Sequence, residues 1–213
     1  MDKLLSGLSF ILKGGFMIYP LLAAAFIGLT VIFERFFMLY IRYATRLDLV
    51  NTTLNHVRSG KLDQAKQSCE VHKTPISAVL AIGIAHFESP YEEMEIAMKN
   101  EAESWIPRLE KRIEVLDTVV TAAPLMGLLG TITGMMSSFR VLSEKGMNEP
   151  NAITGGVAEA LIATATGISI ALICLVAYNV LATRVRFFIY DVESAASKLT
   201  EARMAIARLK ARV

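Results

Sequence analysis

One carboxylate stands in the most apolar segment of the sequence. Residues 151–183 read NAITGGVAEALIATATGISIALICLVAYNVLAT, and Glu159 is the single charged residue among them. A charged side chain inside a membrane-spanning helix is costly, so such residues face a protein interior or a wet cavity and are functional by default. Burial favours the neutral carboxylic acid, which allows the side chain to take up and release a proton. The alternative is a hydrated, structural carboxylate at the mouth of a span, since Glu159 follows Asn151 closely.

Hydroxyl side chains follow Glu159 at helical spacing. Thr166 lies on the same helical face at i+7, and Thr164 flanks that face at i+5. A threonine hydroxyl both donates and accepts, so it can extend a hydrogen-bonded path or hold a water molecule. For any one threonine, a bond to the carbonyl four residues earlier is the more ordinary role. The prediction of an ion path therefore depends on several hydroxyls gathering near one acid.

An earlier apolar run carries a stripe of small residues. Its glycines recur at helical spacing on one face: Gly127, Gly130 and Gly134. Small residues let another helix approach closely, and Ala163 is one of the small residues that can face them from the third run. Close helix packing is the simplest role for this set. Such packing would also bring Thr131 near the line of Glu159 and Thr164.

The composition and the apolar runs predict an all-α membrane protein with three transmembrane helices and long cytoplasmic helical extensions. Hydrophobic residues make up 54% of the chain and the mean hydropathy is +0.46, and three runs reach the about 20 residues that a bilayer span needs. The predicted single membrane domain, residues 1–213, comprises an amphipathic surface helix (1–15), span one (16–38), a cytoplasmic helical segment (39–114), span two (115–139), an outer loop (140–151), span three (152–183) and a cytoplasmic tail (184–213). Within the cytoplasmic segment, Pro75 is expected to open a helix that runs through His86. A later helix is expected to continue into span two, bent but not ended by Pro107.

Basic residues near the span ends predict the orientation. One side of the membrane would hold Arg35, Arg42, Arg46, Arg108, Lys111, Arg112, Arg184, Arg186 and Lys198. The other side would hold Lys3, Lys13, Arg140 and Lys145. Because the richer side is normally cytoplasmic, we expect the N-terminus outside and the C-terminus inside.

Other chemistry finds little support in the sequence. A net charge of +2 gives no basic field for nucleic acid. The three histidines show no metal-ligand spacing, and Cys69 and Cys174 are interpreted as free thiols. The sequence shows no phosphate loop or nucleophile–base pair, so we expect neither an enzyme nor a cofactor.

A single acid per chain implies partners. One glutamate cannot line a path across about 30 Å of hydrocarbon. Several copies of this chain, or a second protein that carries its own acid, are needed to complete a conduit. We therefore expect a homo-oligomer surrounded by membrane lipids.

Two segments resemble a known family. TAAPLMGLLGTITGMMSSF followed by GGVAEALIATATGISIALICLVAYN is similar to spans two and three of the ExbB/TolQ proton channels, whose family also includes flagellar MotA. FERFFML resembles the end of that family's first span. The resemblance covers the three spans and their order, and it identifies the chain as closest to the three-span ExbB/TolQ type.

The resemblance implies a proton-channel motor subunit in the bacterial inner membrane. Family members form a homopentamer around single-span ExbD- or TolR-like subunits, each with an intramembrane aspartate. Proton flow there drives work on a TonB- or TolA-like protein, for outer-membrane import or envelope maintenance. By the same resemblance, Glu159 matches the channel glutamate, and Thr164 and Thr131 match threonines of the proton pathway.

Three alternatives remain open from the sequence. The first is a structural membrane scaffold in which Glu159 only locks the assembly. The second is a gliding- or flagellar-type stator, although MotA-type chains usually have four spans. The third is a small solute transporter, against which the lack of paired or inverted-repeat spans argues. The residues do not decide between protons and sodium ions, and only the resemblance favours protons.

Overall fold

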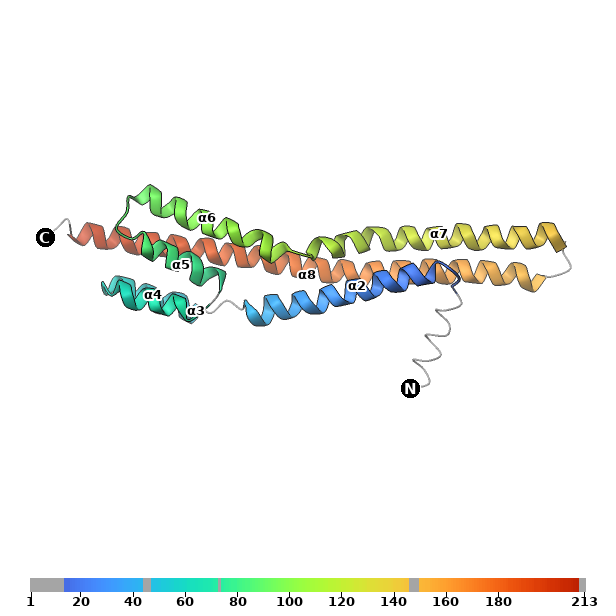
Figure 1. The fold of residues 1–213 in the computed structure, drawn as a ribbon, viewed down its shortest axis with the longest axis horizontal. Helices are drawn as coiled ribbons and strands as arrows, with labels where there is room; N and C mark the ends of the chain where they lie inside the picture. Colours follow the sequence, from blue (N-terminus) through green and yellow to red (C-terminus); the bar gives the residue numbers. More distant parts are fainter. Residues whose placement is uncertain (1–13, 44–46, 73, 146–149, 211–213) are drawn as a thin grey trace, which may run out of the picture. The chain divides into compact units, whose positions relative to one another are not determined.

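The structure is a computed structural model that describes residues 14–43, 47–72, 74–145 and 150–210 (Figure 1). Its elements in chain order are α2 (Ile18–Phe37), the short π-helix η1 (Met38–Arg42), α3 (Leu47–Arg58), α4 (Leu62–Glu70), α5 (Pro75–Ala85), α6 (Tyr91–Glu110), α7 (Ile113–Lys145) and α8 (Pro150–Lys210). The surface helix expected over residues 1–15 lies outside the described residues, apart from Gly14 and Gly15.

Three helical stretches in this part of the chain are long and apolar enough to cross a membrane. They lie within Ile18–Ile41, Tyr91–Glu144 and Thr154–Arg208. These stretches are identified by their length and composition alone. A helix of about 20 apolar residues matches the thickness of a hydrocarbon core. The prediction of a helical, multi-pass membrane protein is thereby confirmed for the described residues.

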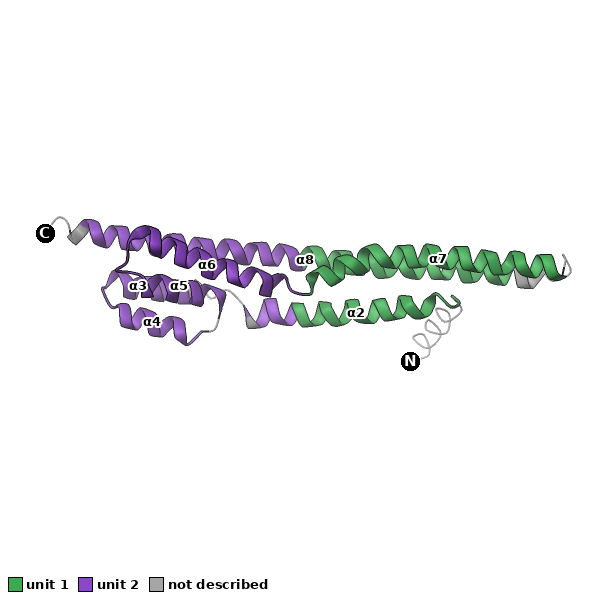
Figure 2. Cartoon of the chain, turned by 45° about the horizontal axis from the view of Figure 1, so that its top comes forward, with its two compact units in different colours: residues 1–35, 112–180 green, residues 36–111, 181–213 purple. Residues whose placement is uncertain are grey.

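Contacts within the chain divide it into two compact units (Figure 2). Unit 1 contains residues 1–35 and 112–180, and unit 2 contains residues 36–111 and 181–213. The division falls inside α8, so each unit contains part of that 61-residue helix.

Unit 1 holds the apolar parts of α2, α7 and α8. Its interior includes Leu21 and Val31 from α2, Leu116 from α7 and Ala171 from α8, all buried. Large apolar side chains cover its exterior, among them Phe26, Phe33, Leu125, Met136, Leu161 and Val176. An apolar exterior of this extent suits lipid or further helices rather than water.

Unit 2 is built from α3 to α6 and the later part of α8. α5 begins as predicted at Pro75, because Thr74 caps it: the Thr74 hydroxyl accepts a hydrogen bond from the Ser77 amide at 3.3 Å, and the Ser77 hydroxyl accepts one from the Thr74 amide. Tyr43 packs edge-on against both Trp105 of α6 and Phe188 of α8, with ring centroids 6.0 and 6.4 Å apart. These aromatic contacts join segments that are far apart in sequence.

The expected uninterrupted helix from Tyr91 into span two is wrong. α6 ends at Glu110, Arg112 has a φ of 65°, and α7 begins at Ile113. A non-glycine residue in the left-handed region costs about 1–2 kcal/mol. Arginine does not favour this conformation, so the sequence around Arg112 did not predict the break.

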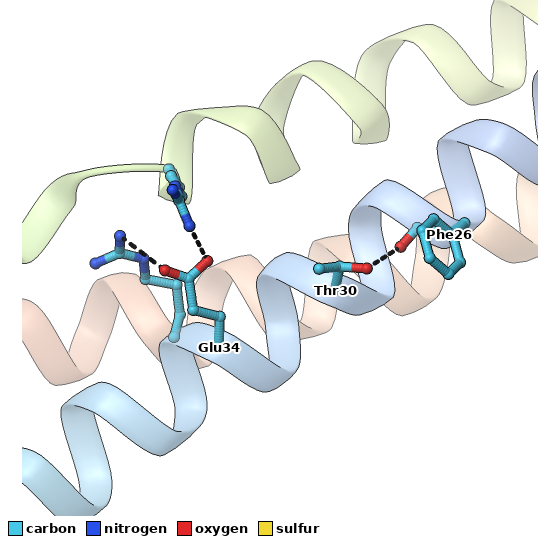
Figure 3. Close-up of polar contacts among 5 residues, drawn as sticks. Phe26, Thr30 and Glu34 are labelled. Atoms are coloured by element: carbon cyan, nitrogen blue, oxygen red, sulfur yellow. Dashed lines mark hydrogen bonds and ion pairs between the residues drawn. The ribbon is translucent and has the colours of Figure 1, made fainter.

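A long-range ion pair accompanies this break. The Arg112 guanidinium donates a hydrogen bond to the Glu34 carboxylate, which also lies 3.8 Å from Arg35 Nη2 (Figure 3). Figure 3 also shows the Thr30 hydroxyl, which donates to the Phe26 carbonyl at 2.8 Å one turn away on α2. Glu34 and Arg112 are 78 residues apart, so their pairing depends on the folded chain.

Candidate functional site

The α7–α8 contact in unit 1 is a seam of small residues. A Cβ atom added to Gly127 would lie 3.0 Å from the Thr164 Cα and 3.1 Å from the Ala163 carbonyl oxygen. One added to Gly134 would lie 2.8 Å from the Gly156 carbonyl oxygen. Because these neighbours are backbone atoms, the helices could not keep this approach with larger residues.

The remaining members of the seam extend the same contact. A Cβ on Gly130 would lie 2.6 Å from the Ala163 Cβ, and one on Gly167 would lie 2.5 Å from the Ala123 carbonyl oxygen. Gly167 is a member that the sequence analysis missed, although its spacing of four residues from Ala163 is a usable signal. The structure therefore brings Gly127, Gly130, Gly134 and Ala163 together.

Thr164 ties the two helices by a hydrogen bond. Its hydroxyl lies 3.0 Å from the Gly127 carbonyl oxygen of α7 and 3.3 Å from the Ala160 carbonyl oxygen of its own helix. One hydroxyl hydrogen is shared between these acceptors, so the ordinary local bond and an interhelical bond coexist. Thr164 is half-buried, and its contact with Gly127 exists only because glycine lets the backbones approach.

We expect Thr164→Val to loosen this contact. Valine keeps the shape but removes the donor, and interhelical hydrogen bonds in membrane proteins contribute about 0.6 kcal/mol on average, with a maximum of about 1.7 kcal/mol. Thermal unfolding in detergent should show a loss of this size, and Thr164→Ser should recover most of it. Thr133→Val is the matched control, because the Thr133 hydroxyl donates within α7. Equal losses in both valine variants would contradict the assignment.

Glu159 lies half-buried in unit 1 against the start of α2. A Cβ added to Gly15 would lie 1.4 Å from Glu159 Oε1 and 2.3 Å from its Cδ, so the carboxyl group occupies the space where a side chain would stand. The Gly15 carbonyl accepts a hydrogen bond from the Ile18 amide at 3.1 Å, which places Gly15 in the turn that leads into α2. The positive end of a helix dipole favours a carboxylate there.

Gly15 is a site residue that the sequence analysis did not name. Gly15 meets two demands that glycine alone meets easily: a φ of +71° and the close approach of Glu159. The signal was present as a glycine next to a span. The sequence did not identify Glu159 as its partner, because the two residues are 144 positions apart.

Gly15→Ala should therefore destabilise the chain beyond its backbone strain. Gly60→Ala is a matched control, since Gly60 has a φ of +72° and nothing within 4 Å of an added Cβ. Backbone strain costs about 1–2 kcal/mol in either variant, so the excess in Gly15→Ala measures displacement of the carboxylate. Thermal unfolding of both variants should be repeated with Glu159→Ala, where the excess should vanish. An excess that persists without the carboxylate would show that this contact is not its cause.

The other predicted hydroxyls bond within their own helices. The Thr131 hydroxyl donates to the Leu128 carbonyl at 2.6 Å, and the Thr166 hydroxyl donates to the Ile162 carbonyl at 2.8 Å. Thr131 is half-buried and directly follows Gly130, which contacts Ala163, so it stands next to the seam. Among the described residues no group of three or more metal-ligating side chains gathers.

These features define a class: a multi-pass membrane protein whose third apolar helix carries a half-buried carboxylate beside a tight seam with the second. The model of the MotA/TolQ/ExbB proton channel family matches residues 71–194, which include α7 and Glu159. The chain belongs to the MotA/TolQ/ExbB proton channel family, as the resemblance in the sequence indicated.

Three relatives illustrate its place near ExbB and TolQ. The chain is 29% identical over 174 residues to the biopolymer transport protein ExbB-like 3 of Synechocystis sp., with 79% of this chain and 81% of that protein covered. It is 42% identical over 92 residues to the Tol-Pal system protein TolQ of Haemophilus influenzae, which covers 43% of this chain and 39% of TolQ. It is 36% identical over 115 residues to the biopolymer transport protein ExbB of Aquifex aeolicus, which covers 54% of this chain and 77% of ExbB.

Proposed function

We propose that this chain is the channel subunit of a proton-driven motor in the bacterial inner membrane. The observation that carries the proposal is Glu159: the single carboxylate of the apolar segment 151–183, half-buried against the start of α2 in a protein of the proton channel family. Such a group can change between charged and neutral forms as protons pass. The names of the relatives, a biopolymer transport protein ExbB and a Tol-Pal system protein TolQ, support a role for this chain in one of these two systems.

The proton pathway would involve Glu159, Thr164 and Thr131. Water and these hydroxyls would link the carboxyl group to an acid supplied by a partner, because one glutamate does not span the bilayer. Thr164 would act partly by holding α8 against Gly127 of α7. Thr131 would have to release its bond to Leu128 before it could donate toward the path.

The assembly would be a homopentamer around ExbD- or TolR-like single-span subunits. Its N-terminus would be periplasmic and its C-terminus cytoplasmic, following the distribution of basic residues. A TonB- or TolA-like protein would receive the mechanical work. The identity of that third protein would decide whether the motor serves nutrient import, envelope maintenance or motility.

Reconstitution with a single-span partner tests the proposal. The chain, the partner and both together should be placed in vesicles that contain a pH-sensitive dye, with an imposed proton gradient. We expect proton flux only when both proteins are present, because each supplies one acid of the path. Equal flux from the chain alone, or saturable transport of a solute by it, would refute the proposal.

A structural scaffold is the second candidate, and the Glu159–Gly15 contact favours it. In this structure the carboxyl group packs against its own chain at the start of α2. A scaffold predicts that removal of the carboxylate breaks up the oligomer. A channel predicts an intact oligomer without proton flux.

A further inference from the structure

A cavity in unit 2 lies away from Glu159 and has no part in the proposed function. It has a volume of about 580 Å³ and is bounded by α6, the later part of α8 and Pro75 at the start of α5. α6 and this part of α8 run beside each other in both views (Figures 1 and 2). The apolar floor is formed by Met98, Ala102, Ile106, Leu109, Val192 and Ala196.

The rim of this α6–α8 groove is acidic. Four glutamates line the groove in the described part of the chain: Glu95 and Glu103 from α6, and Glu193 and Glu201 from α8. All four are exposed. Lys99 also lines the groove, and its ammonium lies 3.9 Å from the Glu103 carboxylate. The negative charge of Glu95 raises the pKa of the neighbouring Tyr91 hydroxyl above its ordinary value, with smaller contributions from burial and from Glu92.

The glutamates are arranged as two pairs along the groove. On each helix they are eight residues apart, which corresponds to about 12 Å of helix. Arg203 of α8 donates hydrogen bonds to Met94 Sδ at 3.5 Å and to the Ser89 carbonyl, so the antiparallel helices bring residues near 94 and 203 together. Glu95 and Glu201 therefore flank one end of the floor, and Glu103 and Glu193 flank the other.

We propose that the α6–α8 groove binds a basic amphipathic helix of a partner protein. An apolar floor between two helices accepts the apolar stripe of a third helix. Acidic residues on both rims select lysine or arginine on the two flanks of that stripe. A helix with uncharged or acidic flanks would leave the rim charges unpaired and would bind more weakly.

A synthetic peptide tests the groove on the intact chain in detergent. The probe is a fluorescent amphipathic helix of about 18 residues, five turns, with a leucine stripe flanked by lysines. The control peptide keeps the leucines and has glutamates on the flanks. Fluorescence anisotropy should show saturable binding of the basic peptide, weaker binding of the acidic one, and loss of binding as ionic strength rises.

Charge reversal on the protein locates the binding. Glu103→Lys with Glu193→Lys should weaken the basic peptide about tenfold or more and strengthen the acidic peptide. Glu93→Lys with Glu110→Lys is the matched control, since both residues are exposed on α6 but do not line the groove. Circular dichroism should show the same helix content in all variants, because the changed side chains are exposed.

Three outcomes would overturn the proposal. The first is equal binding of the basic and the acidic peptide. The second is a control reversal that weakens binding as much as the groove reversal does. The third is failure of the basic peptide to bind together with a lower oligomer mass in the groove reversal, which would assign the groove to a second copy of this chain. None of these measurements depends on proton flux, so the groove and the proposed motor can fail independently.

Discussion

Glu159→Gln is expected to reduce partner-dependent proton flux to about one hundredth of the wild-type value or less, the scale on which loss of a proton-transferring group acts. Glutamine keeps the size and a hydrogen-bonding oxygen but cannot release or take up the proton. The side chain should still occupy the space above Gly15, so the fold and the oligomer should persist. Flux in vesicles and oligomer mass, measured on the same preparation, separate these effects.

Two further variants make this result specific. Glu159→Ala should lose flux to the same extent and should also leave a gap beside Gly15. Glu144→Gln is the control, because Glu144 is an exposed glutamate near the end of α7 and lies 3.9 Å from Arg140 on the same helix. Full flux in both Glu159 variants with normal assembly would end the channel proposal. Collapse of the oligomer in Glu159→Gln would favour the scaffold.

Gly167→Leu is expected to have the largest effect on stability. An added Cβ would lie 2.5 Å from the Ala123 carbonyl oxygen and 3.2 Å from the Gly127 Cα, so leucine requires the two helix backbones to separate. Overpacking typically costs about 1–3 kcal/mol, and we expect a loss at or above the upper end because backbone atoms are the obstacle. Separation of the seam would also break the Thr164–Gly127 hydrogen bond.

Gly155→Leu provides the comparison within the same helix. Nothing lies within 4 Å of a Cβ added at Gly155, and leucine is a better helix former than glycine by up to about 1 kcal/mol. Unfolding in detergent should therefore show a large loss for Gly167→Leu and no loss for Gly155→Leu. Similar stabilities for the two variants would mean that the α7–α8 approach is not needed for the fold.

Local composition and periodicity determined the broad architecture. Apolar runs of sufficient length predicted three membrane-crossing helices, because span length is set by the bilayer and not by neighbouring residues. The capped start of α5 at Pro75 was predictable for a similar reason, since Thr74 and Ser77 are only three positions apart. Glu159 stood out by its isolation in an apolar run, before any contact was known.

Contacts between distant residues belong to the tertiary structure alone. The position of Gly15 beside the Glu159 carboxyl group, the Thr164 bond to Gly127 and the Arg112–Glu34 ion pair all depend on segments that meet only in the folded chain. The acidic α6–α8 groove has the same origin, because only the antiparallel packing of the two helices brings Glu103 and Glu193 to one groove. Side-chain type and spacing are local properties, whereas the partner of a side chain is decided by how the helices pack.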